Sequence, residues 1–148
     1  MNVEDCISAG LLSGVAPDIG KAHSSLLQAG HKLELAKKEL EHEIYENAVI
    51  SAYASMFHSA RALLFMDGYK EKSHYAVFVY VNEKYGHRIE QRHLNELNSL
   101  RLCRHELMYG ISGDSETGKD EAGEAIESAK GFLEAVGRIV SSKPRKTG

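Results

Sequence analysis

The sequence contains no tryptophan, and only two prolines and two cysteines among its 148 residues. Cys6 and Cys103 are far apart and form no CxxC motif, which indicates reduced thiols rather than a disulfide framework. No apolar run approaches the ~18 residues that a membrane span needs. The first residues are acidic where a signal peptide would be basic. We therefore expect a cytoplasmic protein.

An excess of charge of one sign is also missing, because the net charge is −3 and the isoelectric point is near 6.2. Global electrostatics therefore do not indicate a nucleic-acid binder, and any such site must be local. A chain of 148 residues is long enough for one domain with an ordinary core. We expect that domain to span residues 1–140 and residues 141–148 to form a flexible basic tail.

The common catalytic motifs are absent: there is no GxxxxGK[ST], GxGxxG, HExxH or GxSxG sequence. The eight histidines never pair at HxxxH spacing, and the cysteines do not cluster. The sequence therefore predicts neither a metal site nor a bound cofactor.

Helical periodicity dominates what is present. After Pro17 and Asp18, small and apolar residues recur at alternating steps of four and three up to Leu40, and residues 122–140 repeat that pattern. Residues 45–66 are apolar on nearly all sides, as in the central helix of a bundle. These patterns predict an all-α, antiparallel up-and-down bundle of four long helices plus short helices.

The connections are marked by glycine and serine. Gly68 is expected to end the central helix, and Ser73 to cap a short helix that follows. That next stretch has strand propensity, but one strand has no partner, so we expect a helix and no sheet. A fourth long helix is expected over residues 94–108, followed by a loop over residues 111–120.

Positive charge gathers locally in the fourth helix and just before it. Residues 84–106 hold five cations against three carboxylates, although the whole chain is acidic. Four of the five cations are arginines, whose planar fork matches phosphate oxygens. Ordinary ion pairs, such as one between Arg104 and a carboxylate on a neighbouring helix, remain the alternative.

Helix geometry predicts how four polar side chains at the end of this region lie relative to one another. Arg101, His105 and Tyr109 fall along one face, roughly 40° apart at each step, with Arg104 to one side. The row offers a permanent cation, a group that titrates near neutrality and a phenol. Such a set can bind a phosphodiester, and histidine can move a proton.

His58 and Arg61 are the polar residues of interest on the apolar central helix. Neither is expected to be fully buried without a partner. Arg61 either reaches solvent or, together with His58, supports the 101–109 helix as part of the binding site.

Two segments together resemble a known family. Residues 52–75, AYASMFHSARALLFMDGYKEKSHY, and residues 100–110, LRLCRHELMYG, resemble the HEPN superfamily, the higher eukaryotes and prokaryotes nucleotide-binding domains. They look closest to its stand-alone prokaryotic branch, and the resemblance covers about residues 1–140. It implies an all-α bundle and commonly a homodimer.

The resemblance also suggests a chemistry. Many HEPN proteins are metal-independent ribonucleases with an Arg, a polar neighbour and a His four to six residues later. Arg104 and His105 match the first two positions, but Tyr109 stands in place of the terminal His. A phenol with a pKa near 10 is a poor general base at neutral pH. In another branch, a nucleotidyltransferase antitoxin adenylylates a tyrosine close to the His of the motif. Tyr109 lies near the position of that tyrosine in the motif but does not align with it.

Two functions therefore remain open. The first is a homodimeric HEPN protein that binds RNA or nucleotide phosphates and is the toxin-like partner of a nucleotidyltransferase. The second is an active metal-independent endoribonuclease of a toxin–antitoxin or defence system. The predicted catalytic residues are Arg104, His105 and Tyr109, and the predicted binding residues are Arg101, Arg104, His58 and Arg61. We expect the dimer interface on the surface that carries Arg101, Arg104 and Tyr109.

Overall fold

A computed structural model describes residues 1–109 and 117–142, and of Tyr109 the backbone alone. The elements are α1 (Val3–Ser8), β1 (Leu12–Gly14), α2 (Ile19–Glu41), α3 (Tyr45–Asp67), β2 (Tyr69–Glu71), α4 (His74–Tyr85), α5 (Gln91–Tyr109) and α6 (Lys119–Ser142). Within the described ranges, no helix is long and apolar enough to cross a membrane.

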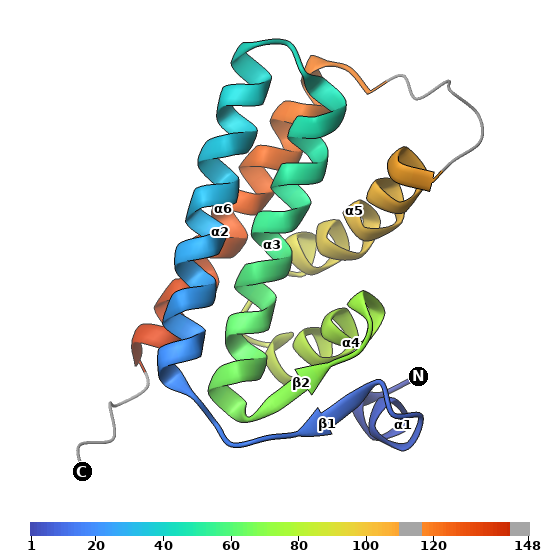
Figure 1. The fold of residues 1–148 in the computed structure, drawn as a ribbon, viewed down its shortest axis with the longest axis vertical. Helices are drawn as coiled ribbons and strands as arrows, with labels where there is room; N and C mark the ends of the chain where they lie inside the picture. The colour runs from blue at the N-terminus through green and yellow to red at the C-terminus, as the bar shows by residue number, and fades with distance from the viewer. Residues whose placement is uncertain (110–116, 143–148) are drawn as a thin grey trace.

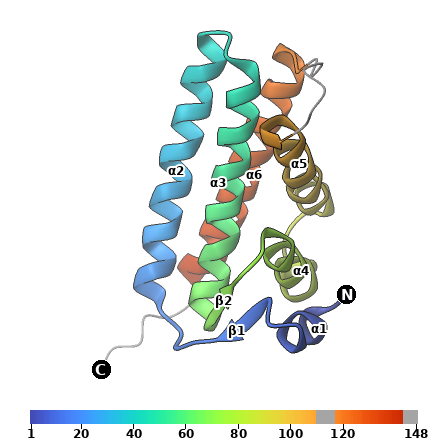
Figure 2. The same cartoon turned by 45° about the vertical axis from the view of Figure 1, so that its right-hand side comes forward.

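Three long helices, α2, α3 and α6, run side by side, and α4 and α5 cross the remaining flank of α3 (Figure 1). A turn of three residues joins α2 to α3, which makes the two helices antiparallel. Figure 2 shows α4 and α5 on the side of α3 that faces away from α2. The predicted all-α bundle is confirmed.

The centre of the bundle is α3, as its apolar sequence predicts. Tyr53, Met56, Leu63 and Leu64 are among its fully buried side chains. The neighbouring helices contact α3 through seams rich in alanine, which allows close packing of the backbones. This packing fixes the position of α3, the helix that carries Tyr53, His58 and Arg61.

Gly68 ends α3 in the left-handed conformation, with φ of 89°, and its N–H donates to the carbonyl of Leu64 at 2.9 Å. Any Cβ here would lie 2.6 Å from the carbonyl oxygen of Val15, so only glycine fits. The chain then forms β2, which pairs antiparallel with β1. Our expectation of no sheet was wrong, because strands of three residues are too short to show alternation in the sequence.

The end of β2 leads directly into α4. The side chain of Ser73 accepts from the N–H of Ala76 at 3.0 Å, which confirms the predicted cap and the short helix. Within the predicted loop, residues 111–116 lie outside the described residues, and α6 begins at Lys119. α6 continues to Ser142, and the rest of the predicted tail is likewise outside the description.

Candidate functional site

Two arginines of α5 lie over aromatic rings of the neighbouring helices. The guanidinium carbon of Arg104 is 5.6 Å from the ring centroid of Tyr53 in α3, and that of Arg101 is 5.2 Å from the ring of Tyr75 in α4. Both arginines are half-buried. A guanidinium stacked on a ring is attracted by the π face and keeps its N–H edge for hydrogen bonds.

The partners of the two arginines differ. Arg101 donates through Nε and Nη2 to the Oδ1 of Asn98, at 3.2 and 3.0 Å. Among the described residues, neither Arg101 nor Arg104 forms a salt bridge. In this part of the chain, Asn98 and the ring of Tyr75 orient Arg101, and the ring of Tyr53 orients Arg104.

A hydrogen-bonded pair lies next to Arg104. The phenol oxygen of Tyr53 is 2.7 Å from Nδ1 of His74, and either group can be the donor, depending on the tautomer. The imidazole also stacks on Phe57, with ring centroids 4.0 Å apart and planes at 5°. His74 is therefore held on two sides.

The electrostatics keep this pair neutral at pH 7. Burial raises the pKa of Tyr53 to about 12, although the charges of Arg104 and Arg101 act in the opposite direction. Burial also lowers the pKa of His74, and the cations Arg104, Arg101 and Arg61 lower it further. A neutral imidazole beside two arginines can accept a proton from a bound group.

His74 and Tyr75 are also the first two residues of α4. The first turn of a helix presents backbone N–H groups and the positive end of the helix dipole, which favour an anion. We call Arg101, Arg104, Tyr53, His74 and Tyr75 the arginine–aromatic cluster. It combines two permanent cations with a helix N-terminus, and its chemistry suits a phosphate.

The structure brings together only part of the predicted row on α5. Arg101 and Arg104 are half-buried against α3 and α4, whereas His105 is exposed. The side chain of Tyr109 lies outside the described residues. The roles predicted for His105 and Tyr109 therefore stay predictions.

Arg61 lies close to the cluster. Its Nε is 2.7 Å from Oε1 of Glu71, and its guanidinium carbon is 5.7 Å from the ring centroid of Phe57 and 5.0 Å from that of Phe65. Because Phe57 also stacks on His74, one ring connects Arg61 to the cluster. Arg61 is only 30% exposed at its side chain, so it does not simply extend into solvent.

His58 is placed differently. Its carbonyl accepts from the hydroxyl of Ser25 in α2 at 2.7 Å. Burial lowers the pKa of His58, with further contributions from the positive charges of Arg61 and Lys32. The ring of His58 also lies 6.2 Å from that of Phe57, tilted by 59°, so its connection to the cluster runs through Phe57. Its predicted binding role stays a prediction.

The sequence patterns do not single out Tyr53, Phe57, His74 and Tyr75 as site residues. Tyr53 and Phe57 fall among the apolar positions of the central helix. Two features of the sequence could have pointed to these residues. Tyr53 and Phe57 are four residues apart and so share one helix face, and a histidine and a tyrosine directly follow the capping serine. Spacing alone does not reveal which helix faces them.

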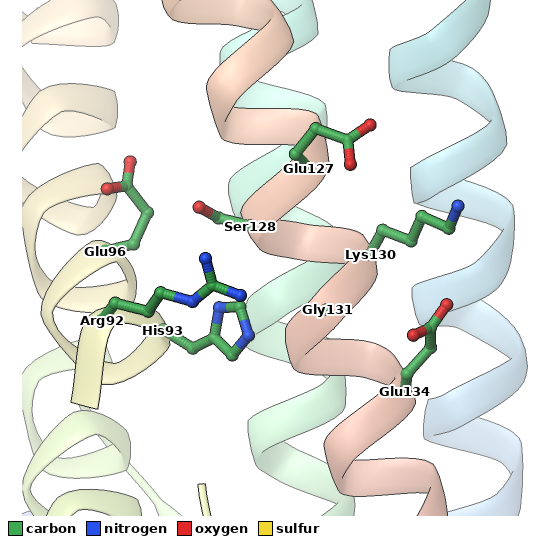
Figure 3. Close-up of a pocket in the computed structure, with 8 residues that line it drawn as sticks. All are labelled: Arg92, His93, Glu96, Glu127, Ser128, Lys130, Gly131 and Glu134. Carbon is green, nitrogen blue, oxygen red and sulfur yellow. The ribbon is translucent and has the colours of Figure 1, made fainter. Parts of the chain in front are cut away.

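A hollow of about 390 Å³ lies between α5 and α6, away from the cluster (Figure 3). Arg92 and His93 project toward α6 at Gly131. His93 is 7% exposed, and its Nδ1 has no hydrogen-bond partner among the described residues. The hollow is lined by three glutamates against two cations, which fits a polyanion less well than the arginine–aromatic cluster.

Comparison with known proteins agrees with this architecture. The sequence pattern of the HEPN domain matches residues 22–139. This chain belongs to the HEPN domain family. The HEPN protein is 34% identical over 90 residues to the Methanocaldococcus jannaschii protein named "Putative toxin MJ0605". The matched residues make up 57% of this chain and 67% of that protein. It is 30% identical over 109 residues to the "UPF0332 protein" of Archaeoglobus fulgidus, and the matched residues make up 72% of this chain and 84% of that protein.

The match confirms the family resemblance and the fold expected from the two sequence segments. It includes α3, α4 and α5, and with them every residue of the arginine–aromatic cluster. The cluster is therefore part of the HEPN domain itself rather than of an added segment.

Proposed function

We propose that this HEPN protein binds the phosphates of RNA or of a nucleotide through the arginine–aromatic cluster. The observation that carries the proposal is the pair of arginines fixed over the rings of Tyr53 and Tyr75 beside the N-terminus of α4. Arg101 and Arg104 present charges that do not titrate, in a planar form that pairs with two phosphate oxygens. The cluster places this positive site on an otherwise acidic chain.

A cytoplasmic homodimer is the second part of the proposal. Two exposed apolar side chains, Leu102 and Met108, lie on the same helix as the arginines, with 55% and 48% of their surfaces accessible. A two-fold interface must be self-complementary, and burial of these side chains would stabilise it. Such a dimer would place two copies of the cluster near one another and raise the local positive potential.

The third part concerns the biological partner. A relative of this chain carries the name "Putative toxin", and we propose a toxin-like role here as well. Following the family resemblance, the partner would be a nucleotidyltransferase antitoxin that acts on the toxin. Co-purification of the two proteins, expressed from one transcript, tests this part separately.

The Tyr53–His74 pair favours a second candidate function, metal-independent RNA cleavage. Neutral His74, in the tautomer whose Nδ1–H donates to Tyr53, would take the proton of a ribose 2′-hydroxyl at Nε2 as that oxygen attacks the phosphorus, and the 5′-oxygen would leave with a proton from water. Arg104 would stabilise the negative charge that develops on the phosphoryl oxygens. His105 and Tyr109 remain the alternative proton-transfer residues predicted from the sequence.

The decisive experiment measures the binding of fluorescein-labelled single-stranded RNA by anisotropy at several salt concentrations. Arg104→Ala should weaken binding about tenfold or more, since a charged hydrogen-bonded contact is worth about 1.5–3 kcal/mol. The slope of log K against log salt should become shallower by about 0.7 for the lost phosphate contact. Arg104→Lys should restore only part of the affinity.

Arg138→Ala is the matched control, because Arg138 is an exposed arginine of α6 and its loss changes the net charge equally. Equal effects of the two variants would contradict a specific phosphate site at Arg104. Incubation of the wild type with an RNA pool in the presence of EDTA then separates binding from cleavage. Products that disappear in His74→Gln but persist in His105→Gln would assign the proton transfer to His74.

A further inference from the structure

The hollow between α5 and α6 continues along α6 toward the start of that helix. A wider hollow of about 730 Å³ adjoins it, and the two share Glu96, Glu127 and Ser128 as lining residues. Most of the combined lining comes from residues 92–96 of α5 and residues 119–134 of α6. We call the two hollows together the α5–α6 groove.

The lining of the α5–α6 groove is acidic. Its carboxylates are Glu96, Asp120, Glu124, Glu127 and Glu134. Among the described residues, none of these five carboxylates forms a salt bridge. Arg92 is paired with Glu90 at 2.6 Å, so only Lys119 and Lys130 in the lining offset the five charges. The excess of negative charge in the groove is therefore as large as that of the whole chain, −3.

Ordinary structural roles account for only part of this acidity. Asp120 lies in the first turn of α6, where the helix dipole stabilises a negative charge, but Glu127 and Glu134 lie beyond that turn. Burial raises the pKa of Glu96, and the charge of Glu124 raises it further. The neighbouring carboxylates thus destabilise one another, and a bound cation would remove that repulsion.

A buried imidazole lines the same groove and lacks a partner. His93 is 7% exposed and projects toward α6 (Figure 3), and its Nδ1 has no hydrogen-bond partner among the residues that the structure describes. Burial, followed by the charge of Arg92, lowers the pKa of His93, so the ring is neutral at pH 7 and has one acceptor nitrogen. A buried polar atom without a partner costs free energy, and an N–H donor of a ligand in the groove would satisfy it.

The carboxylates are spread along the groove instead of converging on one point. Ten residues separate Glu124 from Glu134, which corresponds to about 15 Å along the axis of α6. Within the described part of the chain, no group of three or more His, Cys, Asp or Glu side chains could hold a metal ion. Gly123 and Ile126 also line the groove and can contact methylene groups. These features fit a cation whose charges are distributed along an aliphatic chain.

We propose that the α5–α6 groove binds a linear polyamine, an aliphatic chain with several ammonium groups. The ammonium groups pair with the carboxylates of the groove, and one N–H donates to the imidazole of His93. The methylene groups between them lie over Gly123 and Ile126. The inference does not depend on the proposed function, because it concerns other residues and a ligand of the opposite charge.

The test titrates the full chain with spermidine by isothermal titration calorimetry, at low ionic strength and without RNA. Glu124→Gln/Glu127→Gln should weaken spermidine binding by about tenfold or more, because it removes two charged hydrogen-bond acceptors. The matched control is Glu4→Gln/Glu34→Gln, which changes the net charge equally at exposed positions outside the lining. This control should bind spermidine like the wild type. Spermidine should also raise the melting temperature of the wild type more than that of the groove variant.

Two further measurements test the shape of the ligand and the role of His93. Mg²⁺ should bind about tenfold more weakly than spermidine, because it prefers oxygen ligands that converge on one point. The ¹⁵N resonance of the His93 Nδ1 should shift when spermidine saturates the groove. The resonances of His42, at an exposed position of the α2–α3 turn, should not shift.

Several results would overturn the inference. Equal weakening by the groove and control variants would show a general charge effect, and equal affinities for Mg²⁺ and spermidine would show counterion binding alone. An unchanged His93 resonance at saturation would place the ligand elsewhere. Tighter binding of an oligolysine peptide than of spermidine would assign the groove to a basic segment of a protein. Absence of spermidine binding would exclude the polyamine site and leave the proposed RNA site unaffected.

Discussion

Tyr53 in the bundle core and His74 at the start of α4 are joined by a hydrogen bond of 2.7 Å between the phenol oxygen and Nδ1. The same imidazole stacks on Phe57, four residues along α3 from Tyr53. Two contacts from a rigid central helix thus orient a titratable side chain beside Arg104. A site built in this way keeps its geometry without depending on a loop.

The Tyr53→Phe substitution removes the hydroxyl and keeps the ring under Arg104. The free energy of unfolding should fall by about 0.5–1.5 kcal/mol, the usual net contribution of one hydrogen bond. RNA affinity should change less than in Arg104→Ala, because the ring still orients the guanidinium. Urea unfolding and RNA anisotropy measure the two effects.

Tyr75→Phe provides the matched control, because it also removes a hydroxyl and keeps a ring under an arginine, in this case Arg101. Its stability should stay within about 0.5 kcal/mol of the wild type. A loss of RNA binding in Tyr53→Phe as large as in Arg104→Ala would instead show that the hydroxyl itself contacts RNA.

Acid should destabilise the fold through three histidines. Burial is the largest cause that lowers the pKa of His58, His74 and His93. The unfolded chain therefore binds these protons more readily, so the free energy of unfolding decreases as pH falls below about 6.5 toward the folded pKa values. Three protons set an upper limit of about 4 kcal/mol per pH unit on the slope. Urea unfolding at pH 5.5, 6.5 and 7.5 measures it.

A variant separates the contribution of His74. His74→Gln should reduce the slope by at most about 1.4 kcal/mol per pH unit, the value for one proton. His42→Gln, at an exposed position, is the control for the substitution itself. Greater stability at pH 5.5 than at pH 7.5 would contradict the lowered pKa values of these three histidines.

The sequence predicted the helices and their ends because these depend on local chemistry. The seams of α2 and α6 follow from spacing, and Gly68 and Ser73 act as caps through their own backbone and side chain. The β1–β2 pair could not be predicted in this way. Its two strands are more than fifty residues apart in the chain, and each is too short to show a pattern.

The binding roles of the α5 residues stay predictions, but the structure shows which of these residues pack together. Arginine content singled out Arg101 and Arg104, and a helical wheel grouped them with His105, which the structure leaves exposed. A helical wheel gives the direction of each side chain around one helix axis, but it does not show which neighbouring helix packs against that side chain. Tyr53 and His74 are 21 residues apart, and only the packing of α4 on α3 brings them together.

Asp67, at the end of α3, should be a major stabilising residue. Tyr80 and Tyr85 of α4 both donate to its Oδ2 at 2.7 Å, and burial followed by this hydrogen bond raises the pKa of each tyrosine. Asp67→Ala leaves both hydroxyls without their acceptor, at about 1–3 kcal/mol each. Urea unfolding should therefore show a large loss of stability.

Asp67→Asn is the informative companion variant, because its amide oxygen can still accept. It should be more stable than Asp67→Ala by about 1 kcal/mol or more. A loss below about 1 kcal/mol in Asp67→Ala would mean that water replaces the carboxylate at no net change in free energy.

The proposed dimer gives a prediction for Leu102, an apolar side chain that is 55% exposed on α5. Light scattering of the wild type at tens of micromolar should give twice the chain mass of 16.4 kDa. Leu102→Glu should shift the protein toward monomer, because a charge would have to be buried at the interface. Leu27→Glu, at a 66% exposed position of α2, should leave the dimer intact. A wild-type monomer would exclude this interface.

His93 and Gly131 form a close contact between α5 and α6, and it gives a prediction for both positions. A Cβ at Gly131 would lie 2.6 Å from Cε1 and 2.7 Å from Nε2 of the imidazole. Gly131→Ala should therefore lower the free energy of unfolding by about 1–3 kcal/mol through overpacking. Gly123→Ala and Gly137→Ala, in the same helix with open space at Cβ, should stabilise the fold by about 0.5–1 kcal/mol.

A double-mutant cycle tests the contact itself. In the His93→Ala background the imidazole is gone, so the methyl group of Gly131→Ala occupies vacated space instead of clashing. The double variant should be more stable than the sum of the single effects predicts, by about 0.5–3 kcal/mol for residues in contact. Urea unfolding of the four proteins at pH 7.5, where His93 is neutral because burial lowers its pKa, measures this coupling. Additivity within about 0.5 kcal/mol would show that α5 and α6 separate to accommodate the methyl group.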